Sequence, residues 1–189
     1  GNRVAVTAKL NMVDGVPGGL QLEDSLQVAQ WLADDGTVDA LELTGGSSLA
    51  NPMFLFKGGT PVKEFGETLP WFLRPGFRLV GAKFLRSYPY QEAYFRDMAE
   101  QYRDLLDLPI ILLGGISELA TAQSAIDDGF DFVAMGRALL AEPDLINRIK
   151  ADGDAHTVKA LCTHCNKCMP TIYSGTRCVL TGAPDTSTV

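Results

Sequence analysis

Short apolar runs alternate along the chain with segments whose apolar residues recur at helical spacing, and most of the runs end close to a glycine. We predict strands in four of these runs and helices in the segments that follow them. The predicted strands span residues 3–10, 38–44, 108–113 and 130–135, and the predicted helices span residues 23–34, 91–106, 117–129 and 144–150. Strands that alternate with helices predict an α/β fold with a parallel sheet and helices packed outside it.

The segment between Gly45 and Pro89 has no clear periodicity and is rich in proline, glycine and aromatic residues. A loop of this length inside a compact domain is usually functional or contains short elements of its own. Two interpretations of its aromatic side chains stay open: a satellite core beneath the loop, or a lid that also contacts another subunit. We favour the satellite core for most of them and place a few, near Trp71, at the border of a substrate channel.

The composition narrows the class of protein and its partners. Of 189 residues, 46% are hydrophobic and 21% are charged, which is typical of a globular domain with a core of its own. The 16 basic residues are outnumbered by 23 acidic ones, and the net charge of −7 argues against nucleic acid and anionic membranes as partners. There is no run of about 18 apolar residues, and residues 1–7 do not resemble a secretion signal. We therefore expect a cytoplasmic protein that acts on a small-molecule substrate, with a homo-oligomer left open.

Two neighbouring predicted strands end in glycine, which points to an anion site. Gly114 and Gly115 follow the third strand, and Gly136 with Arg137 follows the fourth, directly before a short helical turn. In a (β/α)8 barrel the loops after strands 7 and 8, with the start of a short helix, often bind phosphate through bare backbone N–H groups. The alternative is that these glycines only make the turns that every α/β fold needs. Together with a guanidinium at Arg137 that can bind bidentately, they favour a phosphate site.

Lys9 stands at the end of the first predicted strand, on the edge where barrel enzymes place their chemistry. A lysine at a strand end is most often simply solvated. If its ammonium group points into the site, it favours negative charge on a bound group, such as the pyrimidine end of a reduced flavin.

Four motifs occur in order along the chain: AKLN at residues 8–11, LLGGI at 112–116, FVAMGRALLAEPDL at 132–145 and CTHCNKCMPTIYSGTRC at 162–178. Together they resemble the NADH:flavin oxidoreductases of the Old Yellow Enzyme family. The resemblance implies FMN at the C-terminal mouth of a (β/α)8 TIM barrel. It also implies that NAD(P)H passes a hydride to the flavin, which then reduces an activated alkene or a related acceptor.

The resemblance also assigns residues to the cofactor. Lys9 corresponds to the basic residue that contacts the flavin pyrimidine edge. Gly115, with Gly114 beside it, corresponds to the phosphate loop after strand 7, and Gly136 with Arg137 corresponds to the phosphate clamp after strand 8.

The same resemblance covers only half of that family's barrel. Our expected fold class is the C-terminal half, strands 5 to 8, of a (β/α)8 TIM barrel in residues 1–150, followed by a Cys-rich C-terminal extension in residues 151–189. The missing N-terminal half of the barrel is the expected partner, because it carries the family's substrate-polarising His/Asn or His/His pair and its tyrosine proton donor. The only histidines here, His156 and His164, lie in the extension. We therefore expect a fragment that is inactive alone, and we leave catalytic residues unassigned.

Two other functions stay open besides this ene-reductase-like activity. One is a different phosphate-binding TIM-barrel enzyme, since the fold does not determine the chemistry. The other is a non-catalytic module that binds metal through its cysteines.

Cys162, Cys165, Cys168 and Cys178 have the spacing C-x2-C-x2-C-x9-C. Three close thiolates and a remote fourth suit a tetrahedral zinc ion or a [4Fe–4S] iron–sulfur cluster. The dienoyl-CoA reductase branch of the family carries such a cluster, with longer spacings between its cysteines. The shorter spacing here makes a cluster harder to wrap, so we favour reduced thiols near the flavin phosphate and assign no metal ligands. His164 is expected to be exposed or hydrogen-bonded rather than a ligand.

Overall fold

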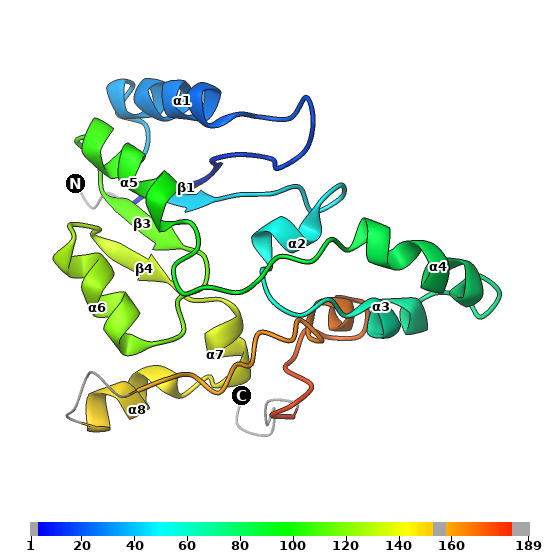
Figure 1. Cartoon of the computed structure of the whole chain (residues 1–189). Coiled ribbons are helices and arrows are strands. Elements are labelled where there is room, and N and C mark those ends of the chain that lie inside the picture. The colour runs from blue at the N-terminus through cyan, green and yellow to red at the C-terminus, as the bar shows by residue number, and fades with distance from the viewer. Residues whose placement is uncertain (1–3, 153–157, 183–189) are drawn as a thin grey trace.

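The computed structural model describes residues 4–152 and 158–182 (Figure 1). Its elements follow in the order β1 (Thr7–Asn11), α1 (Leu22–Asp34), β2 (Ala40–Thr44), α2 (Pro52–Leu55), α3 (Val62–Thr68), α4 (Arg74–Phe84), α5 (Arg96–Leu105), β3 (Ile110–Leu113), α6 (Leu119–Asp127), β4 (Phe132–Ala134), α7 (Arg137–Ala141), α8 (Leu145–Asp152) and the 3-10 helix η1 (Met169–Tyr173). None of the helices within these ranges is both long and apolar enough to cross a bilayer.

The four strands form one parallel sheet in the order β1-β2-β3-β4, so neighbours in the chain are also neighbours in the sheet. Helices follow each of the strands, and the predicted parallel α/β arrangement is confirmed. The observed strands begin later than the apolar runs. β3, for example, begins at Ile110 rather than Leu108, because Pro109 has no N–H to donate to a neighbouring strand.

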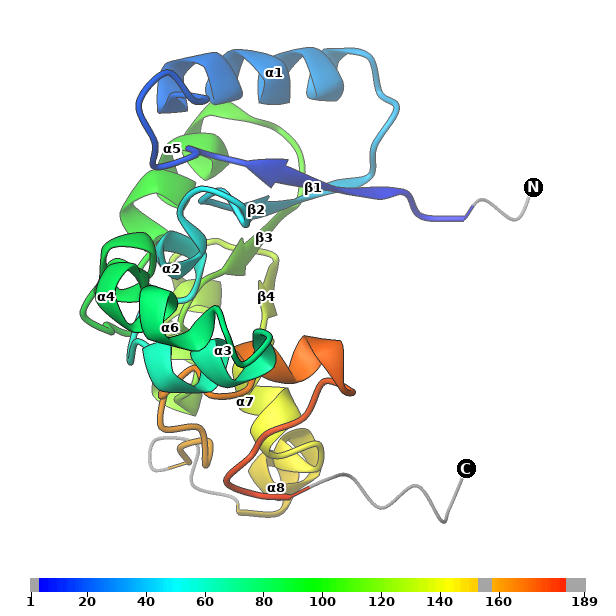
Figure 2. The same ribbon diagram turned by 90° about the vertical axis from the view of Figure 1, so that its right-hand side faces the viewer.

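One face of the sheet carries the core, beneath helices α1, α5 and α6 (Figure 2). Buried side chains of the sheet and of these helices meet there: Leu41, Leu43, Ile110, Leu112, Ala29, Ala99, Tyr102, Ala122 and Ala125. The buried Tyr102 hydroxyl donates to Ser25 Oγ (2.7 Å), and Ser25 donates to the backbone oxygen of Asn11 (2.7 Å). This chain of hydrogen bonds ties α5 and α1 to the end of β1.

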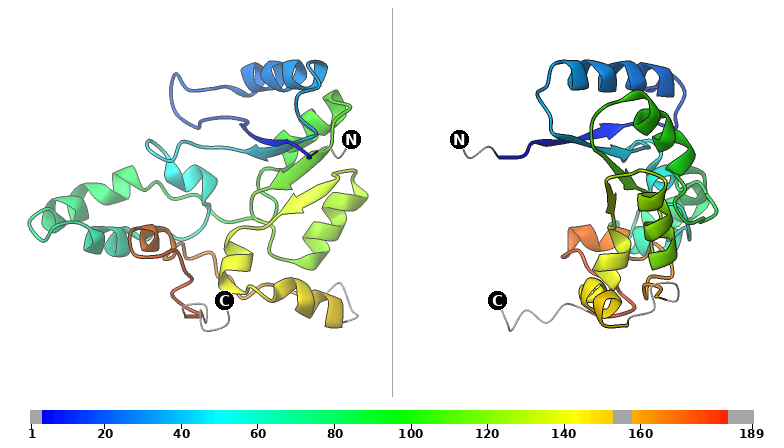
Figure 3. Two further views of the ribbon diagram at one scale, coloured as in Figure 1. Left: turned by 180° about the vertical axis from the view of Figure 1, so that it is seen from behind. Right: turned by 90° about the vertical axis from the view of Figure 1, so that its left-hand side faces the viewer.

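The opposite face of the sheet has no comparable cover among the described residues, and Figures 2 and 3 show the helices of the core on the other side. Lys9, Glu42, Ile111 and Phe132 form a row across this open face. The side chain of Phe132 is 55% exposed. Parallel sheets normally bury both faces, so an exposed aromatic ring on this face is unusual.

Between β2 and α5 the chain forms three helices, α2, α3 and α4, for which the sequence shows no periodicity. Gly58 and Tyr88 pair with each other as an isolated bridge, where the chain leaves the body and returns to it. We call the intervening residues 59–87 the α3–α4 arm. Figures 1 and 3 show this arm projecting away from the sheet.

The predicted satellite core is wrong for the tip of the arm, because α3 and α4 pack through small residues. Gly66 and Gly81 are the buried residues of these two helices. A Cβ at Gly81 would lie 3.0 Å from Cγ1 of Val62, so the helices approach too closely for larger side chains to meet between them. Trp71 and Phe72 consequently stay 79% and 62% exposed, and neither lines the pocket described below.

After β4 the chain forms α7 and α8 and then packs back against the body. A second, smaller core joins the two parts and consists of Ala138, Leu145, Val158 and Ala160. Residues 153–157 and 183–189 lie outside the described residues, and with them His156 and parts of the predicted extension.

Candidate functional site

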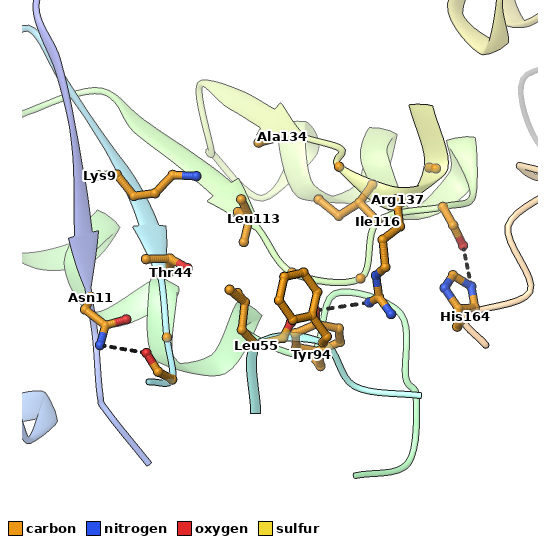
Figure 4. A pocket seen from close by; sticks show the side chains of 18 of the residues that line it. Lys9, Asn11, Thr44, Leu55, Tyr94, Leu113, Ile116, Ala134, Arg137 and His164 are labelled. Carbon is orange, nitrogen blue, oxygen red and sulfur yellow. Dashed lines mark hydrogen bonds between the residues drawn. The ribbon is translucent and has the colours of Figure 1, made fainter. Parts of the chain in front are cut away.

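A pocket of about 420 Å³ opens at the C-terminal ends of the strands (Figure 4). It is lined by all five residues that were predicted to contact a cofactor, namely Lys9, Gly114, Gly115, Gly136 and Arg137. Lys9 belongs to β1, the glycine pair follows β3, and Gly136 precedes α7. The fold therefore gathers at one site residues that are far apart in the sequence.

Gly114 and Gly115 have φ angles of +114° and +79°, in the left-handed region that favours glycine. A Cβ at Gly114 would lie 2.5 Å from Cδ2 of Phe95, and one at Gly115 would lie 2.5 Å from Cδ1 of Tyr94. Backbone conformation and packing therefore require both glycines, whatever the pocket binds. At Gly136, in contrast, no heavy atom lies within 4 Å of the place that a Cβ would take, which leaves open space at the pocket.

Arg137 reaches from the pocket to the cysteine segment. Its Nη1 donates to the backbone oxygen of Lys57 (2.9 Å) and to Oδ1 of Asn166, and its Nη2 donates to the Tyr94 hydroxyl (3.4 Å). Both N–H groups of Nη1 are thus used within the protein. Asn166 is only 1% exposed and donates to two backbone oxygens of the loop at residues 56–59. A phosphate clamp at Arg137 would have to use the other N–H groups of its guanidinium.

Lys9 enters the pocket from β1 and forms an ion pair there. Its Nζ lies 2.8 Å from Oε1 of Glu42, its neighbour in the strand register. The Lys9 side chain is 56% exposed, so water screens the pair. A ligand at this end of the pocket would meet a cation that Glu42 already partly neutralises.

Several other side chains line the pocket without having been predicted as site residues, and Tyr94, Ser117 and His164 are among them. The His164 ring stacks on Tyr90, with ring centroids 3.5 Å apart and ring planes at 7°. Its Nε2 lies 3.3 Å from Ser117 Oγ, and its Nδ1 lies 3.7 Å from the Sγ of Cys162. His164 is thus hydrogen-bonded, but no sequence pattern signals its place in the pocket, because distant segments create these contacts.

Glu92 anchors the loops behind these side chains. It accepts hydrogen bonds from the backbone N–H of Ser117 (3.1 Å), the Ser117 hydroxyl and the Tyr90 hydroxyl. Burial alone would raise the pKa of Glu92, but the hydrogen bonds outweigh it and hold the pKa below its ordinary value. Burial and the Glu92 carboxylate raise the pKa of Tyr90, while burial lowers the pKa of His164 to about 4. At neutral pH the cluster therefore contains an ionised Glu92 beside an uncharged Tyr90 and His164.

We expect Glu92→Gln to lower the free energy of unfolding at neutral pH by about 1–3 kcal/mol, because a neutral amide replaces a charged acceptor of several hydrogen bonds. A carboxyl group whose folded-state pKa is lowered stabilises the fold above its unfolded pKa, here 4.5. That stabilisation is lost as the pH falls through the lower folded-state pKa. Urea unfolding followed by circular dichroism should therefore show a steeper loss on acidification for the wild type than for Glu92→Gln.

The matched control is Glu67→Gln, since Glu67 pairs with Lys63 at an exposed position of α3. This variant should keep the stability and the acid dependence of the wild type. Equal acid dependence for the wild type and Glu92→Gln would contradict the role assigned to Glu92.

The four cysteines surround a second cavity, of about 20 Å³. Cys162, Cys165, Cys168 and Cys178 all line it, and Arg137 lines both this cavity and the larger pocket. None of the four forms a disulfide, and burial raises the pKa of Cys162 and Cys168. Over residues 4–152 and 158–182, no three His, Cys, Asp or Glu side chains are grouped so that they could hold a metal ion.

No protein-family model matches this chain, but its sequence is similar to those of known proteins. The chain is 51% identical to a 4,4'-dithiodibutanoate disulfide reductase of Rhodococcus erythropolis over 183 residues, which are 97% of this chain and 45% of that protein. It is 25% identical to an NADH oxidase of Thermoanaerobacter brockii over 167 residues, which are 88% of this chain and 21% of that protein. The chain thus spans less than half the length of each of these two relatives.

A solved structure with a similar fold is histamine dehydrogenase from Rhizobium sp. 4-9. It matches 94% of this chain with a TM-score of 0.64 and 13% identity, and this chain covers 21% of it. At such an identity the likeness shows the fold alone. The two sequence relatives are oxidoreductases by name, and this chain is similar over most of its length to a part of each.

Proposed function

We propose that this chain is the cofactor-binding half of an FMN-dependent NAD(P)H oxidoreductase of the Old Yellow Enzyme type. The observation that carries the proposal is the pocket, where residues near the ends of β1, β3 and β4 that the resemblance assigns to FMN line a single cavity. The 51% identity to a disulfide reductase supports an oxidoreductase. FMN, when bound, would supply hydride transfer between a nicotinamide and an electron acceptor.

The sheet, in this proposal, provides strands 5 to 8 of a (β/α)8 TIM barrel. The strand order follows the chain order, the core helices cover a single face, and the other face carries the exposed Phe132. In a barrel that second face points inward and is filled by side chains from all strands, so an N-terminal half-barrel would cover it. The chain covers 45% of the disulfide reductase, which leaves room there for such strands.

Different residues of the pocket would bind different parts of FMN. Backbone N–H groups near Gly115 and Gly136 suit the phosphate, and the open space at Gly136 lets it come close. Lys9, at the β1 end, would favour negative charge at the pyrimidine edge of the ring system. Arg137, which directly follows Gly136, and Tyr94 would form another part of the pocket wall, held together by their hydrogen bond.

The test is cofactor binding by a completed barrel. We expect the chain alone to hold FMN poorly and to be inactive, because its open sheet face gives the ring system a wall on one side only. Fusion to the unmatched part of the R. erythropolis reductase should give a protein that absorbs as a flavoprotein and oxidises NADH or NADPH. A folded fusion that stays colourless with added FMN would overturn the proposal, and binding of a phosphorylated metabolite instead would support a different phosphate-binding barrel enzyme.

For the acceptor we propose a small organic disulfide, with an activated alkene as the second candidate. The first rests on the name of the relative at 51% identity, and the second on the resemblance of the four motifs. The two acceptors can be compared by the rate at which the fusion protein oxidises NADH or NADPH in the presence of a dialkyl disulfide or of a cyclic enone. A kcat/KM for the disulfide at least tenfold above that for the enone supports the first, and the reverse order supports the second.

A second cofactor has a specific observation in its favour. The four cysteines line one cavity without being grouped for a single metal ion. An iron–sulfur cluster holds its cysteines around a cube, farther apart than the four ligands of one zinc ion. Four thiols around one cavity are the ligand set that a cluster needs, although the cavity of about 20 Å³ must widen to admit one.

Metal and sulfide analysis of anaerobically purified protein distinguishes these alternatives. About four iron atoms and four acid-labile sulfides per chain would support the cluster. Protein without metal, with four thiols open to alkylation after unfolding, would support the reduced segment favoured by the sequence analysis. One zinc per chain and no flavin would support the metal-binding module.

A further inference from the structure

The tip of the α3–α4 arm exposes six large apolar side chains between residues 71 and 84. Their exposed fractions are 79% for Trp71, 62% for Phe72, 48% for Leu73, 85% for Leu79, 59% for Val80 and 44% for Phe84. Helix α4 buries Gly81 and little else, so its packing on α3 leaves these side chains outside. Apolar patches of this kind are rare on soluble proteins unless another surface covers them.

The same part of the arm is strongly basic. Residues 69–87 of the arm contain four basic residues, Arg74, Arg78, Lys83 and Arg86, and no acidic residue. The rest of the chain contains 12 basic and 23 acidic residues. The surface that covers the arm should therefore be acidic, and an excess of acidic surface is what the remainder of this chain offers.

Helix α1 and its flanks have the complementary character. Residues 21–40 contain five acidic residues and no basic one, and Glu23, Asp24, Asp34 and Asp35 are exposed. Among them the Trp31 side chain is 59% exposed. Helix α1 and the arm lie apart, on different sides of the molecule, in Figure 1, so the two surfaces do not cover each other within one copy.

We propose that the α3–α4 arm of one copy docks on helix α1 of a second copy, and that the contact is made twice in a symmetric homodimer. The apolar tip of the arm would cover Trp31, while Arg78 and Lys83 would face Asp34 and Asp35. A symmetric dimer satisfies both complementary surfaces of each copy and leaves neither exposed. An anionic membrane is a poorer occupant, because the acidic remainder of the chain would be repelled from it.

Charge reversal on each side tests the pairing. Sedimentation velocity should show a dimer at low ionic strength whose dissociation constant rises at least tenfold at high ionic strength. Arg78→Glu with Lys83→Glu should weaken the dimer at least tenfold, and so should Asp34→Arg with Asp35→Arg. These positions are exposed, and cations suit the C-terminal end of α1, so the variants should fold normally. The protein with all four changes should regain the wild-type dissociation constant to within about threefold.

The apolar half of the contact has a matched control. Leu79→Ser should weaken the dimer at least tenfold, whereas Leu49→Ser should not change it, although both leucines are 85% exposed. Hydrogen exchange in helix α4 should slow as the protein concentration rises.

Three results would overturn the proposal. The first is a variant with all four charge reversals that dimerises as weakly as either reversed pair. The second is a wild type that stays monomeric at every concentration and ionic strength. The third is hydrogen exchange in helix α4 that is equally slow at all protein concentrations. The last result would mean that another part of the same protein covers the arm. Binding of the arm to phosphatidylserine vesicles by a monomeric wild type would assign the surface to lipid instead.

Discussion

Gly114→Ala should lower the free energy of unfolding by about 3 kcal/mol, although it adds only one methyl group. The residue has a φ of +114°, which strains any L side chain, and the added Cβ would lie 2.5 Å from the ring of Phe95. Phe95 is fully buried and cannot move without disturbing the core around it. In calorimetry the melting temperature should fall by about 10 °C.

Gly136→Ala is the matched control, because its new methyl group would meet no atom and would only occupy the pocket. Its melting temperature should stay near that of the wild type, while FMN binding in the completed barrel should weaken about tenfold. If Gly114→Ala were as stable as Gly136→Ala, the strain assigned to Gly114 would be wrong. Unchanged FMN binding in Gly136→Ala would remove this position from the cofactor site.

Lys9→Gln should lower the midpoint potential of FMN in the completed barrel by about 30 mV, which corresponds to a tenfold change in the two-electron equilibrium. The ammonium group favours negative charge on the reduced cofactor, and its loss makes reduction less favourable. The effect is smaller than for a fully buried donor, because the Lys9 side chain is 56% exposed. Spectroelectrochemical titration measures the potential directly, and the rate of reduction by NADH should fall in parallel.

Glu42→Gln should shift the potential in the opposite direction, since Glu42 partly neutralises Lys9 across their 2.8 Å ion pair. The double variant Lys9→Gln/Glu42→Gln should match Lys9→Gln alone if Glu42 acts through Lys9. Additive shifts would show that each charge acts on the cofactor independently. An unchanged potential in Lys9→Gln would exclude Lys9 from the cofactor site, even if the protein binds FMN.

The strands and outer helices could be predicted because the burial of their side chains follows a regular pattern along each segment. The run at residues 108–113 is apolar throughout, Ile110 and Leu112 within it are buried in the core, and a glycine follows its end. Helix α1 alternates exposed acidic positions with buried ones such as Ala29 at regular spacing. In such segments local pattern and tertiary packing agree, so the pattern alone is sufficient.

The arm could not be predicted because its helices lack a buried stripe. Helix α4 contains Pro75, Gly76 and Gly81, and large apolar residues such as Leu79 stand exposed on it. Apolar residues recur at helical spacing when one face of a helix is buried and the other is exposed to solvent, and only a small part of this helix is buried. Helix α5 begins later than predicted for a different reason. Ala93 adopts a φ of +48° and its N–H donates to Gly115, so the helix begins only at Arg96.

The pocket was predictable only in part. Glycines at strand ends have a general role that a sequence reveals, and with Lys9 and Arg137 they all lie at one cavity. Ser117 and His164 reach the same cavity through contacts between loops that are distant in the sequence. Glu92 holds those loops in place through hydrogen bonds that no spacing rule encodes.

The bridge between Gly58 and Tyr88 gives the arm the architecture of an insertion. The chain leaves the body and returns to it at adjacent points. The intervening stretch can therefore be lengthened, shortened or replaced while β2 and β3 still pair with each other. If the arm docks on a second copy as proposed, changes in this stretch would alter how copies of the molecule assemble and leave the pocket at the strand ends unchanged. Quaternary structure and catalysis can then diverge at different rates among proteins that share this sheet.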